Sequence, residues 1–320
     1  MSLHTRQFNV ILVLAFLCIL ISCGDNTEQT IIKLDDSEVL SDIELAHNQL
    51  GHIKQSTNKE VYYFGFDLRA SPQKDASQYV PFLNYLSEAT GYLFKLHFTP
   101  KSSSTIEELA KSHVQFAAMG ASGFLKAQQR MEVASLVRGL NHQGKAEYQS
   151  LFVTRPDSRI NNIAQIKNKR LAFGSTDSTQ GHLIPRIMLS KQNIGLKDLK
   201  SHTYTGSHQN CAEAVVSGKF DVCGMQDELA KRLANEGQLK IIHHSVFYPS
   251  SGIVALKSLP ADVIEKVRTA LLAFDPINAH RKNLHNWDKT EMPRGFVEAK
   301  ETDYQELKDW STKLGFLAKN

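Results

Sequence analysis

The chain of 320 residues has few cysteines, no basic block and no apolar run long enough for an ordinary membrane span. Its formal net charge of +4 is spread along the sequence without interleaved aromatic residues, which argues against a nucleic-acid partner. The doublet His243–His244 lacks a third ligand at metal-binding spacing. We therefore expect no metal, no cofactor and no nucleic acid.

A short apolar run near the N-terminus ends at a cysteine. The run extends from Phe8 to Ile21 and is followed by Ser22, Cys23 and Gly24. This order is typical of a bacterial lipoprotein signal, with cleavage before Cys23 and a lipid on its thiol. A plain signal peptide or an N-terminal anchor helix is the alternative. Two or three acyl chains would hold the protein stably on a bacterial membrane, in the cell envelope and on its periplasmic or extracellular face.

The rest of the sequence predicts two lobes. Strands and helices alternate from about residue 60, which indicates an α/β fold whose sheets are mostly parallel and flanked by helices. A polar run after residue 155 marks a crossing between lobes. The predicted segments are the signal peptide 1–22, a polar tether 23–59, a first lobe 60–152 completed by 252–320, and a second lobe 153–251.

Only two cysteines remain in the folded part if this interpretation is right. Cys18 leaves with the signal peptide and Cys23 carries the lipid, so Cys211 and Cys223 stay in an oxidising compartment. A disulfide between them is one outcome. Two buried free thiols fit the apolar positions of both residues at least as well.

The stretch 173–183 passes from a predicted buried strand through a hydroxyl-rich turn into a helix. Free backbone N–H groups at 178–181, the helix dipole and the hydroxyls of Ser178 and Thr179 all favour a negatively charged oxygen there. An ordinary N-cap over a β-to-α turn is the alternative.

Two residues shape this turn. Gly181 would let a ligand approach closely. Pro185 cannot donate a hydrogen bond to the Gly181 carbonyl, so regular helix is predicted to begin only near Pro185.

Two more hydroxyl-rich turns open predicted helices. One contains Ser102, with capping-box spacing between Ser104 and Glu107, and the other contains Ser207 and His208. Ligands of such sheets bind beyond the carboxyl ends of the strands, so these turns predict a cleft for an oxyanion. His208 either donates to that anion or only caps its helix in water.

Three segments together resemble a known family. STQGHLIP at 178–185, TGSH at 205–208 and GKFDV at 218–222 are similar to the phosphate/phosphite/phosphonate-binding proteins of bacterial ABC importers. The resemblance runs from about residue 60 to the C-terminus. It implies a two-lobed periplasmic binding protein fold of type II-like architecture, which closes over a small anion, docks on an ABC permease and catalyses no reaction.

The resemblance also implies roles for individual residues. Ser178 and Thr179 would hold phosphonyl oxygens, and His208 would donate to the same group. Ser102 and Met119 lie where some phosphonate-binding members carry tyrosines, so part of the site departs from the family pattern.

Two further positions bear on a ligand amine. Glu228 lies where an acid of an aminophosphonate binder meets that amine, whereas Ser251 lies where such a protein has an aspartate. A solvated helix residue is the alternative for Glu228. The ligand is therefore expected to be phosphate, phosphite or a phosphonate whose substituent the sequence leaves open.

We predict a lipid-anchored extracytoplasmic solute-binding protein of an ABC importer, which binds a phosphorus oxyanion or phosphonate between its lobes. A sensor or scaffold for a signalling partner is the second hypothesis, because it needs the same fold. A phosphonate or ester hydrolase with His208 as the base is the third, but no nucleophile elbow or metal cluster supports it.

Overall fold

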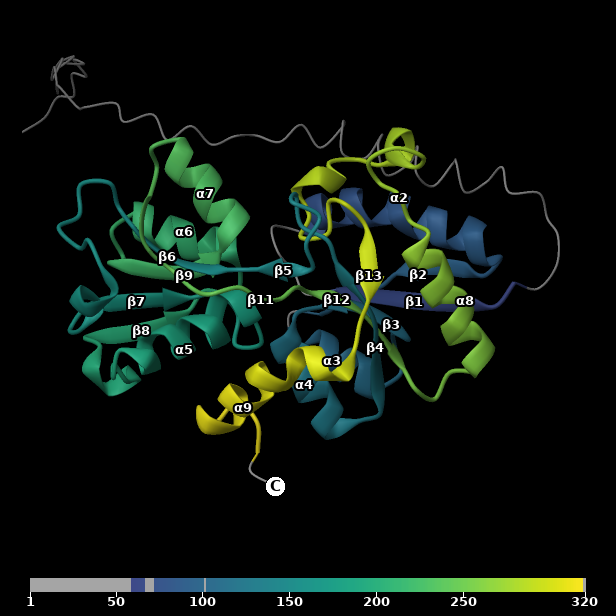
Figure 1. The fold of residues 1–320 in the computed structure, drawn as a ribbon, viewed down its shortest axis with the longest axis horizontal. Helices are drawn as coiled ribbons and strands as arrows, with labels where there is room; N and C mark the ends of the chain where they lie inside the picture. The colour runs from purple at the N-terminus through teal and green to yellow at the C-terminus, as the bar shows by residue number, and fades with distance from the viewer. Residues whose placement is uncertain (1–58, 67–71, 101, 319–320) are drawn as a thin grey trace, which may run out of the picture. The chain divides into compact units, whose positions relative to one another are not determined.

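The computed structural model describes residues 59–66, 72–100 and 102–318. The predicted signal peptide, the lipidation residue Cys23 and the tether up to residue 58 lie outside these residues. The described residues form a six-stranded and a five-stranded sheet, each flanked by helices, with a two-stranded ladder between them (Figure 1). No helix within them is both long and apolar enough to cross a membrane.

The six-stranded sheet is the centre of the first lobe. Its strands lie in the order β13 (Phe296–Glu298), β4 (Val133–Gly139), β12 (Gly252–Leu256), β3 (Phe116–Met119), β1 (Val61–Phe66) and β2 (Leu93–Leu96). β1 is parallel to both of its neighbours, as helical crossovers require. β12 returns from the second lobe, as predicted, and pairs antiparallel with β3 and β4, so the sheet is mixed.

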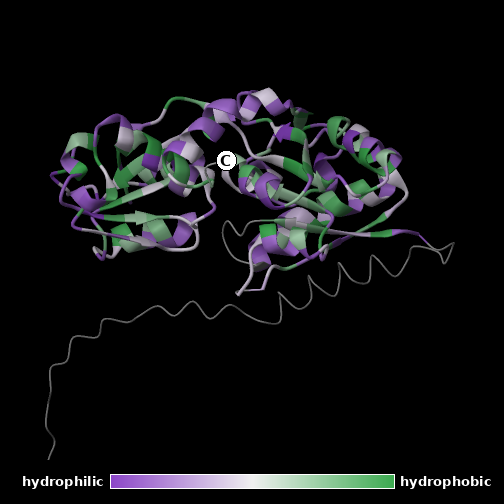
Figure 2. Ribbon diagram, turned by 90° about the horizontal axis from the view of Figure 1, so that it is seen from below, coloured by the Kyte–Doolittle hydropathy of each residue, from purple (hydrophilic) through white to green (hydrophobic). Residues whose placement is uncertain are grey.

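Helices cover both faces of this sheet. They are α2 (Pro72–Thr90), α3 (Thr105–Ala110), α4 (Ala121–Arg130), α8 (Ala261–Leu272) and α9 (Gln305–Lys313), with short turns η4 (Arg281–Asn283), η5 (Trp287–Lys289) and η6 (Glu301–Tyr304). Under α2 and α8, the ring of Phe82 lies 5.0 Å from that of Trp287 and 5.1 Å from that of Phe274. Trp287 is a core residue, whereas Trp310 is only partly buried. The helices carry both hydrophilic and hydrophobic residues, as expected of elements with one buried face (Figure 2).

The five-stranded sheet is the centre of the second lobe. Its strands lie in the order β10 (Lys240–His244), β6 (Ser150–Thr154), β9 (Val222–Gln226), β7 (Arg170–Phe173) and β8 (Ser201–Tyr204). The helical elements are η1 (Ile163–Ile166), η2 (Thr179–Leu183), α5 (Ile184–Lys191), η3 (Leu196–Asp198), α6 (His208–Val216) and α7 (Asp227–Asn235). β7 is parallel to β8 and β9, while β6 pairs antiparallel with β9 and β10. This sheet is therefore mixed as well.

The chain passes between the lobes through β5 (Glu147–Tyr148) and β11 (Tyr248–Pro249), which pair antiparallel. The alternating βα units within each lobe are those that the sequence predicts. The strands that cross between lobes add the antiparallel pairs, which is why neither sheet is mostly parallel.

Cys211 and Cys223 are joined by a disulfide, with their Cα atoms 5.8 Å apart. Both residues are fully buried, so the free-thiol alternative fails although the burial that motivated it is present. The bridge ties α6 to β9. It thereby holds α6, whose first residue is His208, against the first residues of β9.

Candidate anion-binding site

A small cavity lies where helix starts from both lobes meet. Its lining residues are Gly120, Tyr148, Ser175, Ser178, Thr179, Gln180, Gly206, Ser207, His208, Ser251 and Glu291. Its volume is about 30 Å³, against the roughly 10–15 Å³ that one water needs on the same measure. The cavity therefore has room for a compact group and not for a large metabolite.

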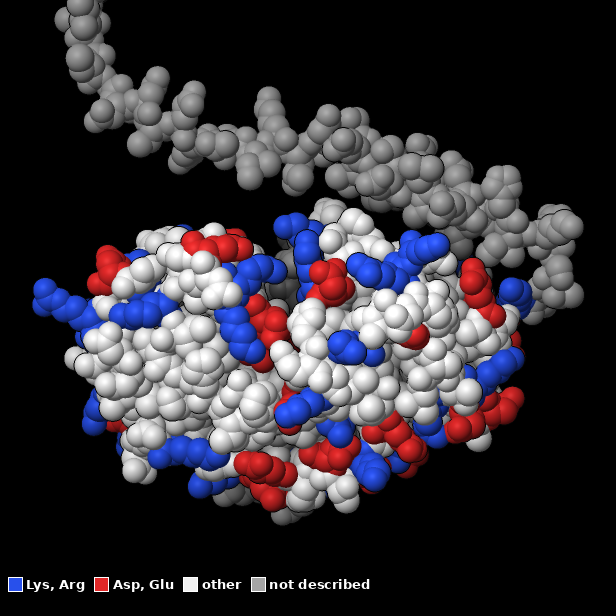
Figure 3. All heavy atoms as spheres, turned by 45° about the horizontal axis from the view of Figure 1, so that its top comes forward, with Lys and Arg blue, Asp and Glu red and all other residues white. Residues whose placement is uncertain are grey.

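Three of the lining residues are helix N-caps. Gly120 precedes α4, Ser178 precedes η2 and Ser207 precedes α6. The N-terminus of a helix carries unpaired N–H groups and the positive end of its dipole. Among the described residues, no Lys or Arg lines the cavity, and the molecular face in Figure 3 shows both charge signs interspersed. The groups that these residues offer to an anion are therefore neutral donors and helix ends.

The turn after β7 has a backbone conformation in which no hydrogen bond from residue 185 is needed. Residues Thr179–Leu183 form a π-helical turn, in which the Leu183 N–H donates to the Ser178 carbonyl at 3.1 Å. Regular helix begins at Ile184, as predicted from Pro185. The Gly181 carbonyl, which Pro185 cannot serve, accepts instead from the Gly174 N–H at 2.9 Å.

Two of the expected free amides of this turn are used by the protein itself. The Ser178 N–H donates to the Ser175 carbonyl at 3.2 Å, and the Gly181 N–H donates to Ser178 Oγ at 2.8 Å. The prediction that all donors from 178 to 181 stay free is therefore wrong, because the turn closes tightly on its own cap. Within the described residues, the amides of Thr179 and Gln180 have no hydrogen-bond acceptor.

Three hydroxyl groups of the wall accept hydrogen bonds from backbone amides. Ser178 Oγ accepts from Gly181, Thr179 Oγ1 accepts from the Ser122 N–H at 2.8 Å, and Ser207 Oγ accepts from the Asn210 N–H at 3.1 Å. A hydroxyl has one proton and two lone pairs, so each keeps its proton to donate elsewhere. The Thr179 bond also joins α4 of the first lobe to η2 of the second.

His208 is held with a defined proton position. Its Nδ1 accepts from the Gln226 N–H at 3.3 Å, and a backbone amide can only donate. The neutral ring therefore carries its proton on Nε2. The ring is 7% exposed, so it is fixed in the wall. The structure brings His208 together with Ser178 and Thr179, as the sequence predicts.

Gly181 lies behind the wall and not on it. A Cβ at this position would be 2.9 Å from His208 Cε1 and 2.9 Å from Ser178 Oγ. The absence of a side chain makes room for these two protein groups, whereas we expected it to make room for the ligand.

His182 supports the same turn from its far side. Its Nδ1 donates to the Thr176 carbonyl at 2.9 Å, and its Nε2 accepts from the Tyr204 hydroxyl at 3.1 Å. Burial lowers the pKa of His182 to about 4. The ring is therefore neutral at physiological pH, and its two hydrogen bonds fix the turn without adding charge.

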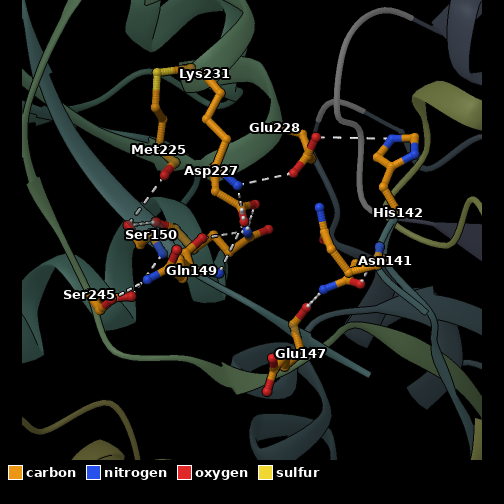
Figure 4. A network of polar contacts seen from close by, with 12 residues as sticks. Asn141, His142, Glu147, Gln149, Ser150, Met225, Asp227, Glu228, Lys231 and Ser245 are labelled. Atoms are coloured by element: carbon orange, nitrogen blue, oxygen red, sulfur yellow. Dashed lines mark hydrogen bonds and ion pairs between the residues drawn. The ribbon is translucent and has the colours of Figure 1, made fainter. Parts of the chain in front are cut away.

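Besides Gly181, three further predicted site residues do not line the cavity. Met119 ends β3 in the hydrophobic core and is 1% exposed, although it directly precedes Gly120. Ser102 is exposed and lines a separate, wider groove. Glu228 lies in the first turn of α7, with an exposed carboxylate that pairs with Lys231 at 3.2 Å (Figure 4). The solvated helix position is the one that the structure gives Glu228.

Asp227, the residue before Glu228, is buried. Asp227 is 7% exposed, and it accepts from the Gln180 side chain at 3.1 Å and from the Gln149 amide at 3.3 Å. Burial raises the pKa of Asp227. Asp227 thereby positions Gln180, whose side chain also donates to the Gln149 carbonyl at 2.7 Å.

A carboxylate on the cavity wall was not predicted. Glu291 comes from the segment between η5 and β13, and its Oε2 accepts from Ser251 Oγ at 2.5 Å. Position 251 thus offers a hydroxyl bound to a carboxylate, where an aminophosphonate binder would offer the carboxylate itself. No motif surrounds Glu291, so the sequence gives no signal for it. Tyr148 and Gln180 are further lining residues that sequence reasoning missed.

A comparison with known protein families identifies the family to which the chain belongs. The model of the family described as "ABC transporter, phosphonate, periplasmic substrate-binding protein" matches residues 64–304. The chain belongs to this family. Its members are extracytoplasmic binding proteins, which supports a role without catalysis.

Two relatives are similar in sequence. The phosphonates-binding periplasmic protein of Escherichia coli K12 is 28% identical over 214 residues, which are 64% of this chain and 63% of that protein. A probable ABC transporter phosphite binding protein, PhnD1 of Prochlorococcus marinus MIT 9301, is 25% identical over 51% of this chain and 52% of its own length. The chain thus spans less than two thirds of either relative.

Solved structures confirm the two-lobed periplasmic binding protein fold. PhnD1 of Prochlorococcus marinus in complex with methylphosphonate matches with a TM-score of 0.73 and 18% identity, covering 81% of this chain and all of that one. A binding protein component of a phosphonate ABC transporter from Pseudomonas aeruginosa matches with a TM-score of 0.70 and 24% identity, covering 81% and 87%.

Proposed function

We propose that this chain is the solute-binding component of an ABC importer, and that it holds a phosphorus oxyanion or a small phosphonate in the cavity. The observation that carries the proposal is the convergence of three helix N-caps on one compact cavity. Donors around it are the hydroxyls of Ser178, Thr179 and Ser207 and the Nε2–H of His208. Relatives whose names include phosphonate and phosphite binding favour the same ligand class.

The cavity size favours a ligand with a small substituent. A volume of about 30 Å³ suits phosphite, phosphate or methylphosphonate better than a long aminoalkylphosphonate. The exposed position of Glu228 removes the acid that would meet a distant amine. The proposed ligand is thus a phosphorus oxyanion that carries at most a small substituent.

Glu291 favours a protonated ligand. A carboxylate repels a fully ionised oxyanion, but it accepts a hydrogen bond from a P–OH group. Monoanions of phosphite, phosphate and methylphosphonate carry such a group near neutral pH, whereas sulfate does not. We infer that Glu291, with Ser251, selects these monoanions against sulfate.

The lipid anchor on Cys23 is part of the proposal. It rests on the short apolar run that ends at Ser22-Cys23-Gly24. Incorporation of labelled palmitate into the wild-type protein, and not into Cys23→Ser, would support it. Equal labelling of the two proteins would remove the anchor and leave the binding function untouched.

Binding is tested by thermal unfolding and calorimetry with phosphite, phosphate, methylphosphonate, 2-aminoethylphosphonate and sulfate. A ligand that binds only the folded state at 100 times its dissociation constant adds about 2.7 kcal/mol of stability. We expect a rise in melting temperature with the first three and the smallest rise with sulfate. No response to any phosphorus compound at millimolar excess would overturn the ligand class.

A further inference from the structure

A second cluster of ligating side chains lies outside the cavity, in the first lobe. It consists of His97, Glu108 and His113, and one ligand atom from each lies within 4.8 Å of the other two. These residues lie within one segment of the chain, 97–113, but on different elements, and their spacing is not that of a familiar zinc motif. The first lobe therefore holds a metal-ligand set that the sequence does not predict.

The backbone fixes all three residues. His97 directly follows β2, and its N–H donates to the Phe64 carbonyl of β1 at 2.9 Å. Glu108 lies in the middle of α3 and is 2% exposed. The His113 N–H donates to the Glu108 carbonyl at 2.9 Å, just after α3 ends. The cluster is thus built on a strand end and a helix, which are rigid supports for a site.

The ligand atoms lie at hydrogen-bond distances from one another, somewhat shorter than the separations around a tetrahedral metal. Glu108 Oε2 lies 2.8 Å from His97 Nε2 and 2.9 Å from His113 Nδ1. Around a tetrahedral ion with bonds of about 2.1 Å, neighbouring donor atoms are about 3.4 Å apart. Movements well under 1 Å, within reach of side-chain rotations, would therefore open room for an ion.

The outer contacts and the access also suit an ion. Ser103 Oγ donates to Glu108 Oε1 at 2.5 Å, which orients the carboxylate and leaves Oε2 for a metal. The side chain of His113 is 55% exposed, so the cluster is open to solvent on that side, while Glu108 is buried. An ion would have an entry path and a place for a water ligand.

We propose that His97, Glu108 and His113 bind a divalent transition metal ion, with Zn²⁺ as the best match. Two imidazoles and one carboxylate are ligands that Zn²⁺ prefers, and they disfavour Mg²⁺ and Ca²⁺, which take oxygen ligands. The ion would join the end of β2 to the middle of α3 and to the turn that follows α3. Its role would be to stabilise the first lobe, separate from the anion cavity.

The site is tested with the full-length, tag-free protein after treatment with a chelator. Titration with Co²⁺ should give the visible absorption bands of a tetrahedral complex at one ion per chain, and Zn²⁺ should displace it. Calorimetry with Zn²⁺ gives the affinity, and thermal unfolding gives the stabilisation. Absence of binding by the wild-type protein at one ion per chain would overturn the proposal.

Two variants separate metal binding from hydrogen bonding. His113→Asn keeps an N–H donor near the position of Nδ1 but is a poor zinc ligand, so we expect Zn²⁺ affinity to fall at least about tenfold with little change in metal-free melting. His244→Ala removes an exposed histidine elsewhere and should bind Zn²⁺ like the wild type. Equal affinities of wild type and His113→Asn would also overturn the site, because the ion would then bind elsewhere.

Discussion

Substituting Gly120 by alanine should weaken anion binding, because the new methyl group would occupy space that Thr179 fills. Gly120 caps α4 in the first lobe and lies on the cavity wall. A Cβ there would be 2.5 Å from Thr179 Oγ1 and 3.6 Å from Ser251 Oγ. The backbone of Gly120 has φ −78° and ψ 168°, which alanine adopts without strain. The cost therefore falls on the contact between the two lobes.

The size of the effect follows from overpacking. Inserting a methyl group into a filled contact costs about 1–3 kcal/mol. The lobes can separate to relieve the clash, so we expect the cost to act on the closed arrangement and not on the folding of either lobe. Affinity for phosphite or methylphosphonate should then fall by about 5- to 150-fold, while the melting temperature without ligand changes little.

Calorimetry on the wild type and four variants tests this reasoning; the variants are Gly120→Ala, Gly195→Ala, Thr179→Ala and the double variant Gly120→Ala/Thr179→Ala. Gly195→Ala is the matched control, because Gly195 has φ −93° and its added Cβ would meet nothing closer than 3.5 Å. Thr179→Ala removes the clashing oxygen, so the loss caused by Gly120→Ala should be smaller in that background than in the wild type. Unchanged affinity in Gly120→Ala, or strictly additive losses in the double variant, would refute the proposed contact.

Three other perturbations have defined outcomes. Burial lowers the pKa of His182 to about 4, so the neutral ring contributes to the free energy of unfolding above about pH 6.5. This contribution, about 3 kcal/mol in total, is lost as the pH falls towards 4. Melting curves of His182→Asn should therefore show a weaker pH dependence over that range. Glu291→Gln should raise sulfate affinity by about tenfold or more in calorimetry, because a repelling charge is lost, and an unchanged sulfate affinity would place Glu291 away from the ligand. Replacing Cys211 and Cys223 by alanine should lower the free energy of unfolding by about 3 kcal/mol in urea titrations, and a reductant should then have no further effect.

Short-range physics made the turn after β7 predictable. Ser178 as the cap and Pro185 as the start of regular helix follow from the donors and acceptors of a few neighbouring residues. The partner of the Gly181 carbonyl did not follow, because Gly174 supplies it from across the turn.

Sheet order explains why one of the predicted turns is absent from the cavity. Ser102 follows β2, which is an edge strand, whereas Gly120 follows β3, which pairs with the crossing strand β12. Among the described residues, the end of β3 lies on the cavity at Gly120, whereas the turn after β2 lines a separate groove, which it shares with Asp177 of the second lobe. The number of hydroxyls in a turn is visible in the sequence, but the position of its strand in the sheet is not, so the sequence favoured Ser102.

Contacts between residues that are distant in the sequence could not be predicted either. Glu291 meets Ser251 across 40 positions. Asp227 and Glu228 are adjacent acids, and only the packing of α7 decides that the first is buried and the second exposed. The local pattern predicts that acids are present, while the fold determines which acid is close enough to the cavity to act.

The same contacts explain how an importer could release what it binds. The Thr179 hydroxyl accepts from the Ser122 amide of the other lobe and still has a proton to donate, so opening the lobes would break a bond at a group that we propose holds the ligand. Lys126 and Asp177 form a second link across the lobes at 2.6 Å, and both side chains are partly exposed, so this pair adds at most about 1 kcal/mol. No Lys or Arg of the described residues lies in the wall, so an anion there would be held by many moderate contacts. A permease that separates the lobes would remove a large share of them in one movement.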